Sequence, residues 1–213
     1  MSKAFRLGFD IDGVITAEGR AEKNIWSRYL SRFLEEEVKL IKNSYDMTEA
    51  YGISQEQLDQ FLDEHLTEIY SQVPPAEGVR ELFCNLKNKG CEIILITARE
   101  SQYRRVTEKW LQKNDITFDS LYHEDDKAPL ARKCSLKFFV DDKMQNIIEL
   151  SEAGIPAALF NRHHNRDSIS RSRLLKLDNY LGRVENWQEI SRIINYRFFS
   201  EKSKKQSRSS KIT

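Results

Sequence analysis

The chain has 213 residues, of which 39% are hydrophobic and 31% charged, and its formal net charge is +1. This length suits one globular domain with a small inserted module, and it can bury a core without disulfides. The neutral charge balance excludes an overall field that draws the protein to nucleic acid or to a membrane. We expect neither a signal peptide nor a membrane span, because the longest apolar runs have only the length of a strand. The three cysteines form no C-x-x-C pair, which predicts reduced thiols and a cytoplasmic location.

Four short apolar runs predict the strands of a parallel sheet. They lie at residues 4–9, 91–97, 135–140 and 155–160. Continuous apolar runs of this length are typical of strands that are buried on both faces. Helical patterns occupy residues 76–89, 101–113, 143–153 and 184–198. The alternation of strand and helix predicts an α/β fold, a three-layer Rossmann-like sandwich around a parallel sheet.

A long helical insertion interrupts this alternation after the first strand. Residues 15–75 contain no strand-like run, whereas residues 21–35 and 54–70 carry apolar side chains at helical spacing. The second of these helices begins with a capping box formed by Ser54 and Gln57. The predicted division is a core of residues 1–14 and 76–199 and a helical module of residues 15–75.

The C-terminal segment differs in composition from the rest of the chain. Residues 201–213 hold five basic residues, one acidic residue and one apolar residue. Burial of so little apolar surface does not offset the entropy lost on ordering, so we expect residues 200–213 to be disordered. A weak contact of this basic tail with RNA or another phosphate-bearing partner is the functional alternative.

Polar residues follow the predicted strands at corresponding places. They are Asp10, Asp12, Thr97, Asp141 and Asp142. In an open α/β sheet, ligands bind beyond the carboxyl ends of the strands, where these side chains gather. Clustered carboxylates repel each other unless a hard cation neutralises them, and Mg²⁺ prefers oxygen ligands. With a hydroxyl and a lysine to bind phosphate oxygens, such a cluster suits phosphoryl transfer to an attacking carboxylate.

Four segments resemble the four motifs of the haloacid dehalogenase-like phosphatases, in the same order. They are DIDGV (10–14), ILITARE (94–100), Lys127 and FFVDDK (138–143). The match spans about residues 5–160, and the combination is far more specific than any one motif. The segments DIDGVIT, NSYDMTEAYGI, ITARE and RVENW are most similar in sequence to those of bacterial nucleotidases related to the 5′(3′)-deoxyribonucleotidases.

The resemblance implies a role for each matching position. Asp10 would be the nucleophile, and Asp12 would protonate the leaving oxygen and then deprotonate the hydrolytic water. Thr97 and Lys127 would bind and orient the phosphoryl group. The insertion at 15–75 falls where such enzymes place a helical cap that closes over the site. The implied reaction is hydrolysis of a phosphomonoester through an aspartyl-phosphate, with a (deoxy)nucleoside monophosphate as the expected substrate.

The resemblance also implies a Mg²⁺ site. Its ligands would be Asp10, the main-chain carbonyl of Asp12, and Asp141 or Asp142. One sequence does not distinguish the last two residues, and either one binds the metal directly while the other acts through water.

Two assignments have competing candidates. Lys133 and Lys137 also precede the acidic pair, but Lys127 precedes a helix and has the spacing of the family. Arg99 lies two residues after Thr97 on the same face of the strand. It either contacts the phosphate or substrate, or it pairs with Glu100 or another acid.

Two further groups have a structural interpretation beside a functional one. His163 and His164 are expected to be structural or solvated, because the carboxylate site already suits a hard cation. Trp26, Tyr29 and Phe33 form either the core of the helical module or a surface that stacks a nucleobase.

Other functions compatible with the sequence keep the phosphate chemistry but change its use. One is a phosphatase of sugar phosphates or of polynucleotide 3′-phosphate ends, which the basic tail mildly favours. Another is a phosphate-binding regulatory protein without turnover. The presence of both Asp10 and Asp12 argues against the latter, because loss of either carboxylate is the simplest route to an inactive relative.

Overall fold

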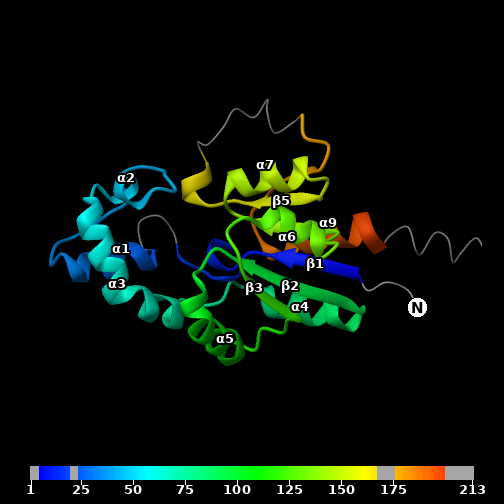
Figure 1. Cartoon of the computed structure of the whole chain (residues 1–213), viewed down its shortest axis with the longest axis horizontal. Coiled ribbons are helices and arrows are strands. Elements are labelled where there is room, and N and C mark those ends of the chain that lie inside the picture. Colours follow the sequence, from blue (N-terminus) through cyan, green and yellow to red (C-terminus); the bar gives the residue numbers. More distant parts are fainter. Residues whose placement is uncertain (1–4, 20–23, 167–175, 200–213) are drawn as a thin grey trace, which may run out of the picture.

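The structure, a computed structural model, describes residues 5–19, 24–166 and 176–199. At its centre is a six-stranded sheet with the strand order β3-β2-β1-β4-β5-β6 (Figure 1). All neighbouring strands of this sheet are parallel. The strands are β1 (Phe5–Phe9), β2 (Cys91–Thr97), β3 (Ser120–His123), β4 (Phe138–Asp141), β5 (Ala157–Phe160) and β6 (Tyr180–Val184). The predicted disordered tail, residues 200–213, lies outside the described residues.

Helices cover both faces of the sheet. The α-helices of the described residues are α1 (Ile25–Phe33), α2 (Met47–Tyr51), α3 (Gln55–Gln72), α4 (Val79–Asn88), α5 (Arg104–Lys113), α6 (Lys127–Lys133), α7 (Met144–Glu152) and α9 (Trp187–Ile194), and those that cover the sheet are α4, α5, α6, α7 and α9. Strand residues alternate between two apolar clusters, so that Phe138 and Phe139 of β4 belong to different ones. The first cluster includes side chains of α4, α5 and α9, and the second includes those of α6 and α7. The predicted three-layer α/β sandwich is therefore confirmed.

The structure corrects two predicted boundaries. The predicted helix at 184–198 is divided, because Val184 ends β6 and helix α9 begins after Asn186, whose side chain accepts a hydrogen bond from the Glu189 amide. The predicted strand at 135–140 begins only at Phe138. Ser135 has a φ of 56° and its amide donates to Arg132, so this residue completes the end of α6 instead.

Helices α1, α2 and α3 form a separate group beyond the carboxyl end of β1 (Figure 1). The predicted capping box of Ser54 and Gln57 opens α3. His65, on α3, packs among the rings of Tyr29, Phe33 and Phe61 at centroid distances of 5.5 to 6.0 Å. The group therefore has an aromatic core of its own, and we keep the name helical module for residues 15–75, which contain these three helices.

Two paired segments connect the helical module to the sheet. Thr16 forms an antiparallel bridge with Pro75. The amide of Ala17 donates to the carbonyl of Pro74 at 2.7 Å, and the amide of Ala76 donates to that of Ile15 at 2.9 Å. The chain thus leaves and re-enters the sheet domain at one place, directly beside the end of β1. Among the described residues, no helix has both the length and the apolar character needed to cross a bilayer.

Candidate active site

Asp10 follows β1 and begins a tight turn, η1 (Ile11–Ile15). Its amide donates to the carbonyl of Val140 at 3.0 Å, so the backbone of Asp10 continues the sheet next to β4. Inside the turn, Gly13 has a φ of 69° and its amide donates to Thr16 Oγ1 at 2.9 Å. A Cβ on Gly13 would lie 1.8 Å from Asp142 Oδ2. Gly13 therefore provides both the backbone conformation and the space for a carboxylate.

We predict that Gly13→Ala destabilises the protein more than Gly90→Ala does. Both glycines have left-handed φ values, 69° and 76°, but a Cβ on Gly90 has no neighbour within 4 Å. Gly90→Ala should therefore lower the free energy of unfolding by about 1–2 kcal/mol, the cost of the backbone conformation alone. Gly13→Ala should cost about 2 kcal/mol more, because Asp142 has to move. Denaturant unfolding of the two variants measures this difference, and equal costs would contradict it.

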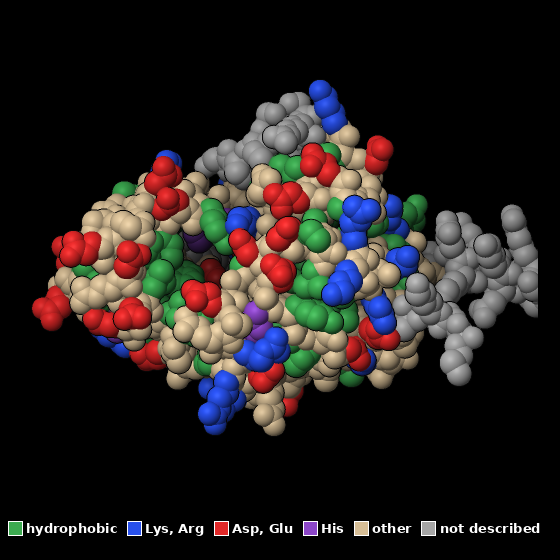
Figure 2. Space-filling view, viewed as in Figure 1, with side chains coloured by type: hydrophobic (Ala, Val, Ile, Leu, Met, Phe, Trp, Pro, Cys, Tyr) green, Lys and Arg blue, Asp and Glu red, His purple; other side chains and the backbone are tan. Residues whose placement is uncertain are grey.

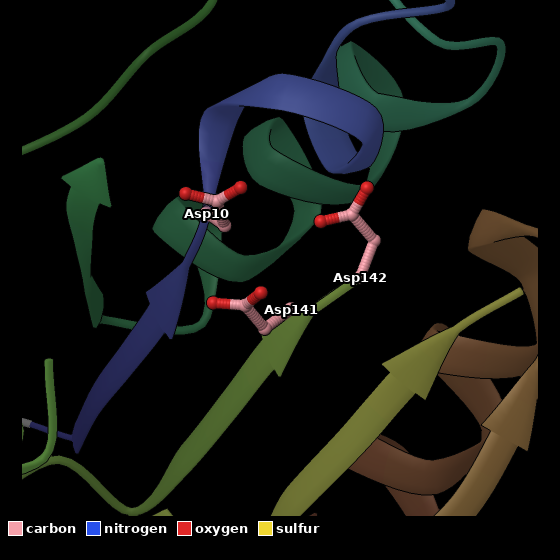
Figure 3. Close-up of side chains that lie close together, drawn as sticks. All are labelled: Asp10, Asp141 and Asp142. Carbon is pink, nitrogen blue, oxygen red and sulfur yellow. The ribbon is translucent and has the colours of Figure 1, made fainter. Parts of the chain in front are cut away.

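Three buried carboxylates meet at the carboxyl ends of β1 and β4. Figure 3 shows the side chains of Asp10, Asp141 and Asp142 turned toward a common space. One oxygen of each lies within 4.8 Å of one oxygen of each of the others. This set of oxygen donors is of the kind that hard divalent cations take. Both members of the predicted pair Asp141 and Asp142 belong to the cluster.

Lys127 lies between two of these carboxylates. Its Nζ donates to Asp10 Oδ1 at 2.6 Å and to Asp141 Oδ2 at 2.7 Å, and all three side chains are buried. Burial opposes the charge of Lys127, but the two carboxylates outweigh it and raise the pKa of the ammonium. Burial also raises the pKa of Asp10 well above its usual range, although Lys127 counteracts this. The competing candidates Lys133 and Lys137 are exposed.

The two aspartates at the end of β4, Asp141 and Asp142, have different surroundings. Asp141 accepts hydrogen bonds from the Lys143 amide at 2.8 Å and from Asn146 Nδ2 at 3.0 Å. Asp142 has His164 Nε2 at 3.2 Å from its carboxylate. Burial lowers the pKa of His164, but the hydrogen bond to Asp142 outweighs it and raises the pKa above its ordinary value. Each aspartate is thus oriented by a separate set of donors.

Asp12 forms a bidentate ion pair with Arg99. Arg99 Nε and Nη2 donate to the two Asp12 oxygens at 2.8 and 2.6 Å. Burial lowers the pKa of Arg99, but Asp12 outweighs this and raises it. Of the two alternatives for Arg99, the structure shows contact with an acid, and this acid is Asp12. Thr97 is fully buried at the end of β2, where its Oγ1 accepts from the Arg99 amide at 3.2 Å.

A cavity of about 320 Å³ connects these groups to the helical module. Figure 2 shows the hollow between the module and the rest of the molecule. Its lining includes Asp10, Asp12, Arg99, Lys127, Asp141, Asp142, His163 and His164 on the sheet side, and Trp26, Tyr45, Tyr51, Leu62, Leu66 and Tyr70 on the module side. Of the three predicted module aromatics, Trp26 faces the cavity, whereas Tyr29 is buried and Phe33 packs on Phe61.

Glu18 also lines the cavity, although no motif or spacing in the sequence selects it. Its carboxylate accepts a hydrogen bond from Trp26 Nε1 at 3.1 Å. Burial, followed by the charges of Asp12 and Asp142, raises the pKa of Glu18 to about 7. No local pattern marks this residue, because its environment is formed by the entry of the chain into the module.

We predict that Glu18 makes the protein less stable as the pH rises from about 4.5 to about 7. The folded state holds the Glu18 proton more tightly than the unfolded state, so the unfolded state binds fewer protons in this window. Without divalent cations, this contribution should reach roughly 2 kcal/mol after allowance for solvent screening. Glu18→Gln should remove it, whereas Glu77→Gln, at an exposed position, should keep it. Unfolding curves at pH 5 and pH 8 provide the measurement, and identical pH dependence in both variants would contradict the prediction.

The fold is that of haloacid dehalogenase-like hydrolases. A hydrolase of this family from Streptococcus pneumoniae, SP0104, superposes with a TM-score of 0.61 at 12% identity, over 91% of this chain and 100% of that one. A hydrolase of the same class from Deinococcus radiodurans, solved with bound phosphate and sodium, gives a TM-score of 0.60 at 14% identity, over 92% of this chain and 97% of that one.

The family within this class follows from sequence comparison. The family model described as 5′ nucleotidase, deoxy (pyrimidine), cytosolic type C protein matches residues 4–199, and the chain belongs to this family. YqfW of Bacillus subtilis, which is named as a nucleotidase, is 29% identical over 194 residues, 89% of this chain and 93% of that protein. A nucleotidase of Clostridium acetobutylicum is 25% identical over the same shares of the two chains. The protein is therefore a phosphoric monoester hydrolase, as the sequence motifs predicted.

Proposed function

We propose that the protein hydrolyses (deoxy)nucleoside monophosphates through an aspartyl-phosphate on Asp10, with Mg²⁺ as cofactor. The observation that carries this proposal is the placement of Asp10, which lies in the acidic cluster and beside Lys127 in one cavity. We assign residues 15–75 as the cap over this cavity and the cytoplasm as the location. The aromatic side chains of Trp26, Tyr45 and Tyr70 support a nucleoside, because flat apolar surfaces stack on a base.

In the first step, a carboxylate oxygen of Asp10 attacks phosphorus and the bond to the leaving oxygen breaks. Asp12 gives its proton to that oxygen, so that an alcohol departs. Lys127 and Thr97 hold the phosphoryl oxygens. In the second step, water attacks phosphorus, the bond to Asp10 breaks, and Asp12 takes the proton from water. Inorganic phosphate leaves and the Asp10 carboxylate is restored.

The acidic cluster fits a divalent cation. Asp10, Asp141 or Asp142, and the main-chain carbonyl of Asp12 would hold it, and all of these donors are oxygen atoms. When bound, the cation supplies charge that stabilises the phosphoryl group and keeps the carboxylates ionised.

A substrate panel with and without chelator tests the proposal. We expect nucleoside 5′- and 3′-monophosphates to be turned over faster than sugar phosphates, and we expect chelation to stop turnover. Rapid turnover of sugar phosphates without turnover of nucleotides would overturn the nucleotide assignment. The assignment as a phosphatase would stand in that case. An oligonucleotide with a 3′-phosphate should be a poor substrate, because a cavity of about 320 Å³ fits a small molecule.

A further inference from the structure

Arg99 makes more contacts within the protein than a residue that only binds substrate needs. Its side chain is fully buried, and its guanidinium makes the bidentate pair with Asp12 described above. The third nitrogen, Nη1, donates to Thr107 Oγ1 on α5 at 3.1 Å. The face of the guanidinium lies over the ring of Tyr70, with Arg99 Cζ 3.7 Å from the ring centroid. All three guanidinium nitrogens and one face therefore have partners within the protein.

The backbone of Arg99 is fixed as well. Its amide donates to Thr97 Oγ1 at 3.2 Å, and its carbonyl lies 2.8 Å from His123 Nδ1, at the end of the neighbouring strand β3. A carbonyl only accepts, so His123 Nδ1 carries the proton in this contact. The amide and the carbonyl of Arg99 are thus both bound to residues at the ends of sheet strands, and these contacts fix the place from which the side chain extends.

The ion pair with Arg99 leaves part of the Asp12 carboxylate available on the side that faces the cavity. A carboxylate offers about four acceptor positions, and a bidentate guanidinium uses two of them. The Asp12 side chain is 32% exposed and lines the cavity, so its remaining acceptor positions are open on the side where a reacting group enters. The two parallel N–H groups of the planar guanidinium fix the plane of the Asp12 carboxylate. A lysine ammonium would attract the carboxylate as a point charge but would not fix its plane.

We propose that Arg99 is a positioning residue that orients Asp12 to take the proton from water during hydrolysis of the aspartyl-phosphate, and that helix α3 contributes through Tyr70. This inference rests on the proposed function, since it needs the intermediate on Asp10. In the step concerned, the water oxygen bonds to phosphorus, the bond from phosphorus to the Asp10 oxygen breaks with its electron pair, and one water proton passes to Asp12. A misdirected Asp12 carboxylate slows this step because proton transfer depends on alignment.

The connection to α3 gives the helical module a part in catalysis. Tyr70 lies in the last turn of α3, and Trp110 Nε1 on α5 donates to the carbonyl of Val73, just beyond that helix, at 2.6 Å. The end of α3 is therefore anchored to the same helix whose Thr107 contacts Arg99. Because cation–π contacts gain strength when they are desolvated, the Tyr70 ring helps to fix the guanidinium plane.

The test uses p-nitrophenyl phosphate, whose leaving group departs without a proton from the enzyme. With Arg99→Met, hydrolysis of the intermediate becomes slower than its formation. We expect kcat and KM to fall together, by about tenfold or more, with kcat/KM changed by less than about threefold. Rapid mixing should show a burst of nitrophenolate approaching one equivalent per enzyme. Arg99→Lys should show the same pattern, because lysine keeps the positive charge but cannot donate two parallel hydrogen bonds to the Asp12 carboxylate.

Tyr70 variants test the contribution of α3 without removing a buried charge. Tyr70→Leu, which loses the aromatic face, should lower kcat and KM together by a smaller factor than Arg99→Met. Tyr70→Phe, which keeps the aromatic face over the Arg99 guanidinium, should lower the two constants less than Tyr70→Leu does. Arg105→Lys, at an exposed position on α5, is the matched control and should change neither constant.

Two results would overturn the inference. A raised KM with unchanged kcat in Arg99→Lys would show that Arg99 binds the phosphoryl group directly. Equal kinetics of Tyr70→Leu and Tyr70→Phe would remove the role of α3. Failure of the proposed function is distinct from both, because it would show as absent turnover of aryl phosphate in the unchanged protein, or as full turnover in Asp10→Asn.

Discussion

Replacing Asp10 by Asn should lower phosphatase activity by about 10³-fold or more, with little loss of stability. An amide is a far weaker nucleophile toward phosphorus than a carboxylate, so the aspartyl-phosphate does not form. The amide oxygen can still accept the hydrogen bond that Lys127 Nζ now donates at 2.6 Å. Removal of one of three clustered carboxylates also relieves repulsion. The measurement is kcat/KM with p-nitrophenyl phosphate, together with denaturant unfolding.

Asp115→Asn is the matched control for this prediction. Asp115 is exposed and has a φ of 52°, a left-handed conformation that asparagine adopts as readily as aspartate. The Asp115→Asn variant makes the same chemical change but keeps every carboxylate of the cavity. The activity of this variant should therefore equal that of the unchanged protein. Asp10→Asn with activity within a factor of about ten of the control would refute Asp10 as nucleophile.

The strands that the sequence predicted are those with continuous apolar runs. Strands β4 and β5 are buried along their whole length, and β2 is nearly so. The edge strands were not predicted. In β3 only Leu121 is buried, and in β6 only Val184 is buried. A short edge strand buries few side chains and gives no periodic signal, so its recognition depends on the neighbour with which it pairs.

The predicted aspartates and Thr97 lie at or just after the ends of strands, whereas Lys127 begins α6, and the structure brings Asp10, Lys127 and Asp141 into direct contact. Their convergence was predictable because all carboxyl ends of parallel strands lie on one edge of a sheet. The contacts of Glu18 and Tyr70 were not predictable. These residues reach the cavity from the helical module, and the docking of that module is a tertiary property with no counterpart in local sequence patterns.

Lys127→Met should lower the free energy of unfolding by about 3–5 kcal/mol when divalent cations are absent. The ammonium is the hydrogen-bond partner of both Asp10 and Asp141, and loss of one member of a buried charged group leaves the others uncompensated. Methionine has a similar length and high helix propensity, so the start of α6 should remain intact. Activity should also be lost, because the phosphoryl group loses its cationic contact.

The cation dependence of this loss distinguishes charge compensation from packing. With Lys127 absent, added Mg²⁺ should restore stability to the variant by a larger amount than it adds to the unchanged protein, because the cation neutralises the same carboxylates. Lys133→Met, an exposed change on the same helix, should cost less than about 1 kcal/mol and should not respond to Mg²⁺ differently from the unchanged protein. A destabilised Lys127→Met that is insensitive to Mg²⁺ would show that Lys127 acts through packing, and that the three aspartates do not share a cation.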